Sequence, residues 1–380
     1  MPLVKGYDSA LLIVGGLWLL WRWRAGRPAP DLGSLRLPLI AFFGWLALST
    51  IVAYDAGGAI KGLRQWVAHG LAFLMFIDVV ETRREMAALG AAFLIGNTVL
   101  GVFCVWEYFS GVGRLGGPTE TWPTVLGCYL NFALPWTLCM LYSTRNPNLR
   151  FFIAIVLLLL IFSLGGTLTR ASLLGFLVSV LVLLGYLAHQ KKWGIQAVLV
   201  ALFLLLLLFP SFIGRLASTG PQMVSDIGYS RPVFWEQSLS LLDEGMRLLT
   251  GVGMRRSFHM VFKQQPYALV DSQFAHLAHA HNFLIHYLVI WGVPGLLAYL
   301  WFLGSYIKKL VESFRRNPSP VGQWIQWVAL AALVGFWVKE LFDVAVGFRT
   351  NMTCYWWTMA AGIVAGRLPS GEQAHAIGKP

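Results

Sequence analysis

The chain has 380 residues, of which 57% are hydrophobic and only 12% are charged. Water-soluble domains carry about a quarter of their residues as charged, so this composition excludes most soluble enzymes and all disordered or fibrous classes. The 29 lysines and arginines exceed the 17 acidic residues and give a formal charge of +12. Because the basic residues lie in short clusters between apolar runs, they indicate orientation in a membrane and not nucleic-acid binding.

Apolar segments long enough to cross a membrane recur along the chain, since a spanning helix needs about 20 mostly apolar residues. They lie near residues 9–21, 37–54, 65–80, 86–108, 124–142, 150–168, 171–188, 195–213, 281–304, 322–340 and 347–366. The sequence therefore predicts an all-α polytopic membrane protein with about 11 to 12 transmembrane helices.

One connection is much longer than the others and contains no spanning segment. We expect an N-terminal bundle of about eight helices over residues 1–214, a large loop over 215–280, and about three helices with a short tail over 281–380. Within the loop, apolar residues recur at roughly helical spacing among polar ones, which predicts amphipathic helices on the membrane surface. These residues are Phe234, Leu239, Leu241, Leu242, Leu248 and Leu249.

The basic residues are distributed unequally between the two sides of this predicted bundle. Sixteen of the 29 lie in the odd-numbered connections and the C-terminal tail, and seven lie in the N-terminal segment and the short even-numbered connections. The positive-inside rule then places the odd-numbered connections in the cytoplasm and the long loop outside. An N-terminus on the outside follows from an odd number of spans.

Arg170 lies between two long apolar segments, where a charge is costly unless it is paired or faces a hydrated cavity. An arginine that extends to the membrane interface is the simple alternative. The flanking Thr167, Thr169 and Ser172 favour an anion site, because hydroxyl groups add donors to a guanidinium group.

Three further cations are candidates for the same role. Arg231 precedes Trp235 by about one helical turn, an arrangement that also fits a solvated helix start packed against tryptophan. Lys61 and Arg64 share a helix face at the outer end of the third span, where they fit either ligand binding or simple flanking of the membrane.

The densest group of histidines is His276, His279, His281 and His286. Interfacial polar residues are one explanation, and a metal site is another. Because the neighbouring acid is only Asp271, the group lacks the ligands that zinc or iron usually requires. A neutral imidazole instead suits a general base at physiological pH, and we expect no metal and no other cofactor.

His281-Asn282, followed after nine residues by Gly292-Val-Pro-Gly295, resembles a motif of bacterial O-antigen ligases and of the wider O-antigen ligase and polymerase superfamily. The Thr-x-x-Arg-x-x-x-x-Gly step at Arg170 and the Arg-x-x-x-Trp pattern that starts at Arg231 agree with it. The resemblance extends from about Leu37 to Gly366. Ligases of this family usually have twelve spans with both ends inside, and a missing first helix would account for the difference.

The resemblance implies a GT-C-like glycosyltransferase of the Gram-negative inner membrane whose active site faces the periplasm. It implies transfer of O-antigen polysaccharide from undecaprenyl pyrophosphate to a sugar hydroxyl of the lipid A core, without a cofactor. The implied partners are these two glycolipids and the surrounding membrane lipids.

The residues themselves fit that chemistry. Loss of a glycosyl group from pyrophosphate leaves negative charge that preorganised guanidinium groups stabilise without Mg²⁺, and the sequence has no Asp-x-Asp pair to hold a divalent ion. We assign Arg170 and Arg231 to the pyrophosphate, with Arg64 and Lys61 as weaker candidates.

His281 is the expected base for the acceptor hydroxyl. Asn282 is expected to orient the substrate or the start of the helix, with Trp235 in a supporting role. Gly292 and Gly295 are expected to break the ninth span and to let helices approach closely. Without a carboxylate placed as nucleophile, direct displacement with inversion is preferred, although Asp226, Glu236 and Asp271 leave this open.

Two kinds of alternative remain. An O-antigen polymerase or a protein O-oligosaccharyltransferase of the same superfamily differs from a ligase in its acceptor. A lipid-linked glycan transporter or flippase would also have about eleven helices, but it should carry an inverted repeat and polar residues in mid-membrane. An arrangement in which Arg170 and His281 open to opposite faces would favour transport.

Overall fold

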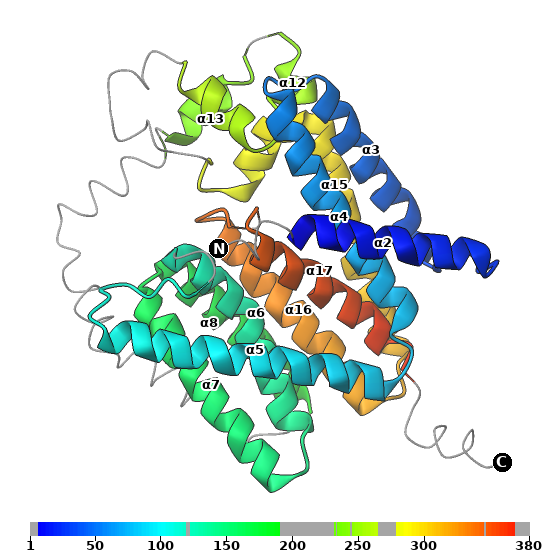
Figure 1. Ribbon diagram of the computed structural model, residues 1–380, viewed down its shortest axis with the longest axis vertical. Coiled ribbons are helices and arrows are strands. Elements are labelled where there is room, and N and C mark those ends of the chain that lie inside the picture. The colour runs from blue at the N-terminus through cyan, green and yellow to red at the C-terminus, as the bar shows by residue number, and fades with distance from the viewer. Residues whose placement is uncertain are drawn as a thin grey trace.

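The computed structural model describes residues 7–118, 122–190, 232, 234–243, 245–264, 279–345 and 347–368. Over these ranges the chain is helical and contains no strand (Figure 1). The predicted all-α polytopic membrane fold is confirmed in this part of the chain.

Each predicted span that lies in the described ranges coincides with one long helix, while the span expected at 195–213 lies outside them. The long helices are α2 (Tyr7–Arg24), α3 (Arg36–Ile51), α4 (Ala56–Val79), α5 (Arg83–Phe109), α6 (Pro123–Ser143), α7 (Pro147–Thr167), α8 (Arg170–His189), α15 (Phe283–Arg316), α16 (Pro320–Glu340) and α17 (Arg349–Ala365). Among the described helices, seven are long and apolar enough to cross a membrane, and α2, α4 and α17 are not among these seven.

Shorter elements complete the described part. They are the 3-10 turn η1 (Gly33–Leu35) and, within the predicted loop, α12 (Arg247–Thr250) and α13 (Arg256–Phe262). Leu248 and Leu249 of α12 are half exposed, at 51% and 52%. This exposure suits a helix that lies on a membrane surface, as the spacing of its leucines predicts.

Long helices joined by short connections run in opposite directions, so the bundle has two ends that can be told apart by their contacts. We call one the His281 end, where Arg349 of α17 donates from Nε to Asp8 of α2 at 2.8 Å. We call the other the Arg83 end, where Arg83 of α5 donates to Ser319 at 2.8 Å. Arg170 begins α8 at the His281 end, on the same side as His281.

The helices form two packed groups that α16 and α17 join (Figure 1). One group contains α3, α4 and α15 around an aromatic core that includes Phe42, Trp66 and Trp291. The other contains α5 to α8. At the α8–α16 crossing a Cβ on Gly175 would lie 2.5 Å from the carbonyl oxygen of Gly335, so only glycine lets these backbones approach so closely.

Helix α15 is broken at Gly292, which has a φ of 70°. The break leaves room for the loop, because Val252 donates its amide to the carbonyl of Val289 at 2.8 Å and Gly253 donates to that of Ile290 at 3.1 Å. Three residues further on, Gly295 lies against Trp45 of α3, and a Cβ there would meet the indole at 2.6 Å. Gly292 therefore allows close approach of the loop backbone, and Gly295 leaves room for the side chain of Trp45.

Candidate active site

His281 lies in a tight turn that leads into α15. Asn282 caps this helix, since its side-chain oxygen accepts from the amides of Leu284 at 3.0 Å and Ile285 at 3.2 Å. His281 has a φ of 49°, which few residues other than glycine adopt, and its amide donates to Nδ1 of His279 at 3.4 Å. The cap and the turn therefore fix the direction in which the His281 side chain leaves the backbone.

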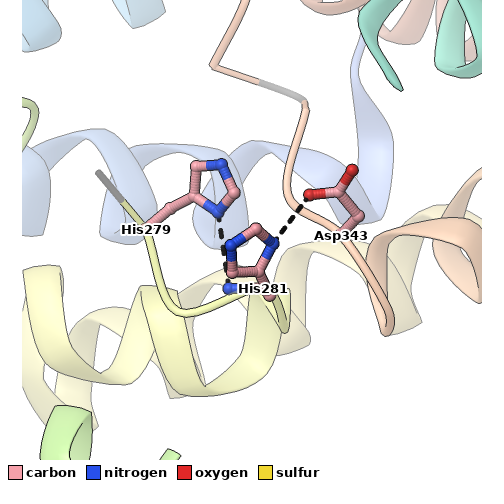
Figure 2. A group of neighbouring side chains, drawn as sticks. All are labelled: His279, His281 and Asp343. Atoms are coloured by element: carbon pink, nitrogen blue, oxygen red, sulfur yellow. Dashed lines mark hydrogen bonds and ion pairs between the residues drawn. The ribbon is translucent and has the colours of Figure 1, made fainter. Parts of the chain in front are cut away.

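The side chain of His281 meets Asp343, which follows α16 at the same end of the bundle (Figure 2). Nδ1 of His281 lies 3.1 Å from Oδ1 of Asp343, and the two side chains are 31% and 12% exposed. A carboxylate that accepts from Nδ1 fixes the tautomer and leaves Nε2 with a free lone pair. This is the geometry of a general base with its orienting acid.

Both neighbours of His281 hold defined charge states. Burial alone would raise the pKa of Asp343, but the ammonium of Lys339 and the hydrogen bond from His281 outweigh it and hold this pKa well below its ordinary value. Burial, reinforced by the charge of His281, lowers the pKa of His279 to about 3. At neutral pH Asp343 is therefore ionised and His279 is neutral.

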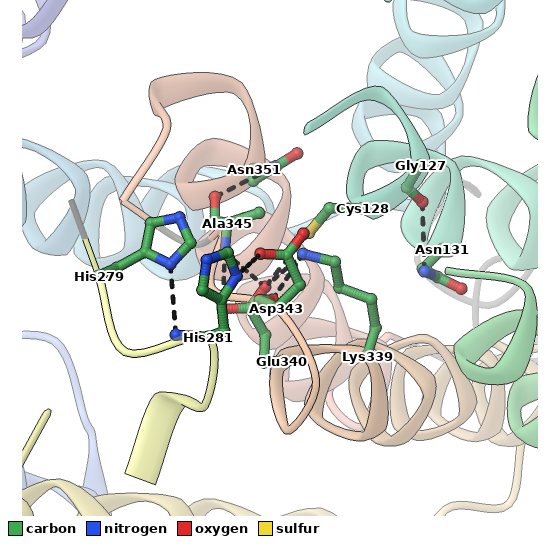
Figure 3. Close-up of polar contacts among 10 residues, drawn as sticks. All are labelled: Gly127, Cys128, Asn131, His279, His281, Lys339, Glu340, Asp343, Ala345 and Asn351. Atoms are coloured by element: carbon green, nitrogen blue, oxygen red, sulfur yellow. Dashed lines mark hydrogen bonds and ion pairs between the residues drawn. The ribbon is translucent and has the colours of Figure 1, made fainter. Parts of the chain in front are cut away.

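A buried ion pair anchors the loop that carries Asp343 (Figure 3). Nζ of Lys339 donates to the backbone carbonyl of Asp343 at 2.7 Å and to Oε1 of Glu340 at 3.1 Å. The Glu340 carboxylate accepts from the amide of Ala345 at 2.9 and 3.1 Å. Lys339 is fully buried and Glu340 is 1% exposed, so the pair acts on the site through the backbone of the loop.

Neighbouring helices fasten the same loop from two sides. Asn351 of α17 donates to the carbonyl of Ala345 at 3.0 Å, and Gln65 of α4 donates to that of Gly347 at 2.8 Å. On α6, the thiol of Cys128 lies 3.7 Å from Oε1 of Glu340 (Figure 3). The α16–α17 loop is thus held by contacts from α4, α6 and α17.

His279, His281 and Asp343 each offer one ligand atom, and these atoms lie within 4.8 Å of one another. Two histidines and one carboxylate are a donor set that open metal sites use. Here the same atoms are engaged in hydrogen bonds within the group, Nδ1 of His281 with Asp343 and Nδ1 of His279 with the amide of His281. A metal ion would have to replace these bonds, and the absence of a metal stays a prediction.

Arg170 is the first residue of α8, and its side chain is exposed. Five residues further into the helix, Gly175 lies against Lys339, with 3.0 Å between the Cβ position of Gly175 and the Cβ of Lys339. Five residues of helix rise about 7.5 Å, so Arg170 lies about that far beyond Gly175 toward the His281 end. This matches the side of the bundle on which the Asp343 loop lies.

The hydroxyl groups expected to assist Arg170 are directed elsewhere. Thr167 and Thr169 share a hydrogen bond of 2.7 Å between their hydroxyls, and Thr167 also bonds to the carbonyl of Leu164 at 2.8 Å. Ser172 is fully buried next to Gly127 of α6. These residues stabilise the α7–α8 turn and its packing on α6, and Arg170 alone extends from the turn.

The structure describes two of the three other predicted cations. Lys61 and Arg64 of α4 are exposed, and Arg64 precedes the Gln65 that holds the Asp343 loop. Arg231 lies outside the described residues. Trp235 is partly buried against the aromatic core, and its neighbour Phe234 has its ring 5.9 Å from that of His281.

The sequence interpretation missed two arginines at the His281 end, Arg255 and Arg349. Arg255, which precedes α13, packs over α4, where its Cγ would lie 3.3 Å from a Cβ on Gly62. Burial lowers the pKa of Arg255, and the charges of Arg349 and Arg64 lower it further. We call Arg64, Arg255 and Arg349 the arginine cluster.

The sequence interpretation also missed Asp343 and the pair that holds its loop. A signal was present, because Lys339, Glu340 and Asp343 fall within five residues at the end of an apolar span, and ionisable groups in such a place are rare without a function. What the sequence lacks is any sign that this segment meets His281, which is 62 residues away.

Residues 132–300 match the O-antigen ligase family. This match supports a place for the chain in the O-antigen ligase and polymerase superfamily. The match runs from α6 into α15 and includes Arg170, His281 and Gly292, which confirms the resemblance noted from the sequence. Members of this family are glycosyltransferase-like membrane enzymes. Among curated proteins the chain has no significant match.

Proposed function

We propose that this protein is an O-antigen ligase, which transfers O-antigen polysaccharide from undecaprenyl pyrophosphate to a sugar hydroxyl of the lipid A core. The observation that carries the proposal is the hydrogen bond of 3.1 Å between His281 and Asp343 at one end of a membrane bundle of this superfamily. It provides a base beside the membrane surface, where two amphiphilic substrates meet.

In the proposed reaction Nε2 of His281 takes the proton of the acceptor hydroxyl while the hydroxyl oxygen attacks the anomeric carbon. The new glycosidic bond forms as the bond from that carbon to the pyrophosphate oxygen breaks. The proton remains on His281, where the ionised Asp343 stabilises the imidazolium. The pyrophosphate leaves with its negative charge, which guanidinium groups at the same end stabilise.

Inversion is the expected stereochemistry. Asp343 is bonded to His281, and Glu340 is buried and bonded to Lys339 and Ala345. Neither carboxylate is free to attack an anomeric carbon, so a covalent glycosyl-enzyme on these residues is disfavoured. Of the three acids that the sequence left open as nucleophiles, Asp226 and Asp271 lie outside the described residues, and Glu236 is exposed and stays open.

For the leaving group we keep Arg170, Arg64 and Lys61 as candidate contacts, because all three lie at the His281 end. Arg231 stays a candidate from its sequence pattern alone. A transporter is disfavoured, because Arg170 and His281 lie at the same end of the bundle and not at opposite ends.

We infer that the His281 end faces the periplasm of a Gram-negative inner membrane. The basic pairs of the odd-numbered connections, such as Arg83 with Arg84 and Arg315 with Arg316, lie at the opposite end. The positive-inside rule assigns that end to the cytoplasm.

The test is reconstitution of the full chain in vesicles with carrier-linked O-antigen and lipopolysaccharide that lacks O-antigen. Transfer to the lipopolysaccharide, detected as larger species on a gel, is expected for the wild type and not for His281→Ala. Longer carrier-linked glycan would instead indicate a polymerase, and glycan on an added protein acceptor would indicate a protein O-oligosaccharyltransferase. Full transfer by His281→Ala would remove this residue from the catalytic role.

A further inference from the structure

A cleft of about 750 Å³ lies between α5 and the helices α4, α6, α16 and α17. Its lining is mostly apolar and includes Phe93 on α5, Trp136 and Met140 on α6, and Trp357 on α17. The cleft lies within the membrane bundle and not on the face that carries His281, and the reaction described above does not use it.

The cleft runs along the direction in which the helices cross the bundle. Arg349 and Thr353 line it at the His281 end, and Arg83 and Ser143 line it at the Arg83 end. From Arg349 to Ala361, both in its wall, α17 rises about 18 Å. The shape is therefore that of a long slot that starts at the active-site end.

The slot is open on one side. Ala87 and Ala91 of α5 belong to its lining and are nevertheless exposed. In a membrane this side faces lipid chains, so an apolar chain enters laterally and needs no passage through water.

The His281 end of the slot is cationic. Arg349 begins α17 six residues after Asp343 and donates to the carboxylate of Asp8 at 2.8 Å, and the charges of Arg349 and Arg64 both act on Arg255. A head group with several negative charges is complementary to this surplus of positive over negative charge. Gly347, which Gln65 holds in place, lies in the chain between Asp343 and Arg349, and Arg349 lines the slot.

We propose that this cleft holds the isoprenoid chain of the pyrophosphate-linked carrier, with the phosphate next to the chain at the arginine cluster and the sugar-linked phosphate toward His281 and Arg170. The inference rests on the proposed function. A slot of about 750 Å³ suits one long chain, which the carrier has, whereas phospholipids and lipid A carry several chains. A pyrophosphate also matches three guanidinium groups better than a phosphodiester with one charge does.

A substitution that fills the slot tests the position of the chain. Gly90 of α5 lines the slot and a Cβ there would make an ordinary contact of 3.8 Å with Sδ of Met140, so the ring of Gly90→Trp is expected to fill the slot. Ala88→Trp is the matched control, because Ala88 is exposed on the same helix and does not line the cleft. Both are assayed with two donors that carry the same glycan on a full-length or a short isoprenoid chain.

The wild type is expected to have a KM about tenfold lower for the long-chain donor, equivalent to about 1.4 kcal/mol. This preference is modest because the chain leaves lipid and not water. Gly90→Trp should raise the long-chain KM to the short-chain value and leave the short-chain reaction unchanged, and Ala88→Trp should behave as wild type. An unchanged long-chain KM in Gly90→Trp, or an equal loss with both donors, would overturn the placement of the chain.

The head-group position has its own test. Arg255→Gln should raise the KM of both donors several-fold, while Arg256→Gln, which removes the neighbouring charge, should not. Equal effects of the two substitutions would overturn the assignment to the arginine cluster. These outcomes differ from failure of the proposed function, in which the wild type transfers glycan from neither donor.

Discussion

His281 and Asp343 meet from segments that are fixed by different kinds of contact. The His281 turn is held locally, by the Asn282 cap and by the bond to His279. Every residue in these contacts lies within four positions of His281. The Asp343 loop is held by Lys339 and Glu340 and by Asn351 and Gln65 on other helices. The base is therefore positioned by its own sequence neighbours, whereas its acid is held both by its neighbours on α16 and by α4 and α17 of the packed bundle.

The largest effect is expected when His281 loses the carboxylate of Asp343. Asp343→Asn removes the charge that stabilises the imidazolium and allows the wrong tautomer of His281, so kcat should fall about a thousandfold. Initial rates in vesicles measure it, with protein amount and monodispersity as controls for folding. A loss below about threefold would show that His281 acts without its acid.

The next largest effect is expected for the buried pair of Lys339 and Glu340. Lys339→Met leaves the Glu340 carboxylate buried without its ammonium partner and should destabilise the protein by about 3 to 5 kcal/mol. The double variant Lys339→Met with Glu340→Gln should recover most of this loss, because no charge stays buried alone. Thermal unfolding in detergent measures both variants.

The double variant also separates stability from positioning. Its kcat should remain well below that of the wild type, because Lys339 no longer holds the backbone of Asp343. Wild-type kcat in a variant with recovered stability would mean that the pair serves the fold alone and not the site.

His279, in the turn that carries His281, should make the stability of the protein depend on pH. The pKa of His279 is about 3 in the folded chain against an ordinary value near 6.5. Below pH 6.5 the unfolded chain binds a proton that the folded chain excludes, so the free energy of unfolding should decrease by at most about 1.4 kcal/mol per pH unit. His279→Gln should show a smaller decrease in melting temperature between pH 7 and pH 5, and both proteins should be compared at pH 8 as the reference.

Chelation should have the smallest effect. Because His279, His281 and Asp343 satisfy one another by hydrogen bonds, EDTA is expected to change the transfer rate by less than about twofold. Loss of activity that an added divalent ion restores would instead identify these three residues as metal ligands.

Much of the bundle could be predicted from the sequence because hydrophobic spans are local signals. Ten of the expected spans coincide with helices in the described ranges, and the turn at Asn282 follows from a common capping residue. His281 was found from its motif. Arg170 was expected to share its ligand with Thr167 and Thr169, but these hydroxyls bond to each other, because a short turn lets them do so without a ligand.

The sequence by itself determined the membrane class and the order of the helices, and its motifs indicated the superfamily and singled out His281, because each of these depends on residues close together in the chain. Only the tertiary structure decided that Asp343 is the partner of His281, that the charges of Arg64 and Arg349 act on Arg255, and that a slot beside α5 leads to Arg349. The physical reason is that contacts between helices depend on how the whole bundle packs, and the short-range periodicity of one helix carries no record of which distant segment it meets.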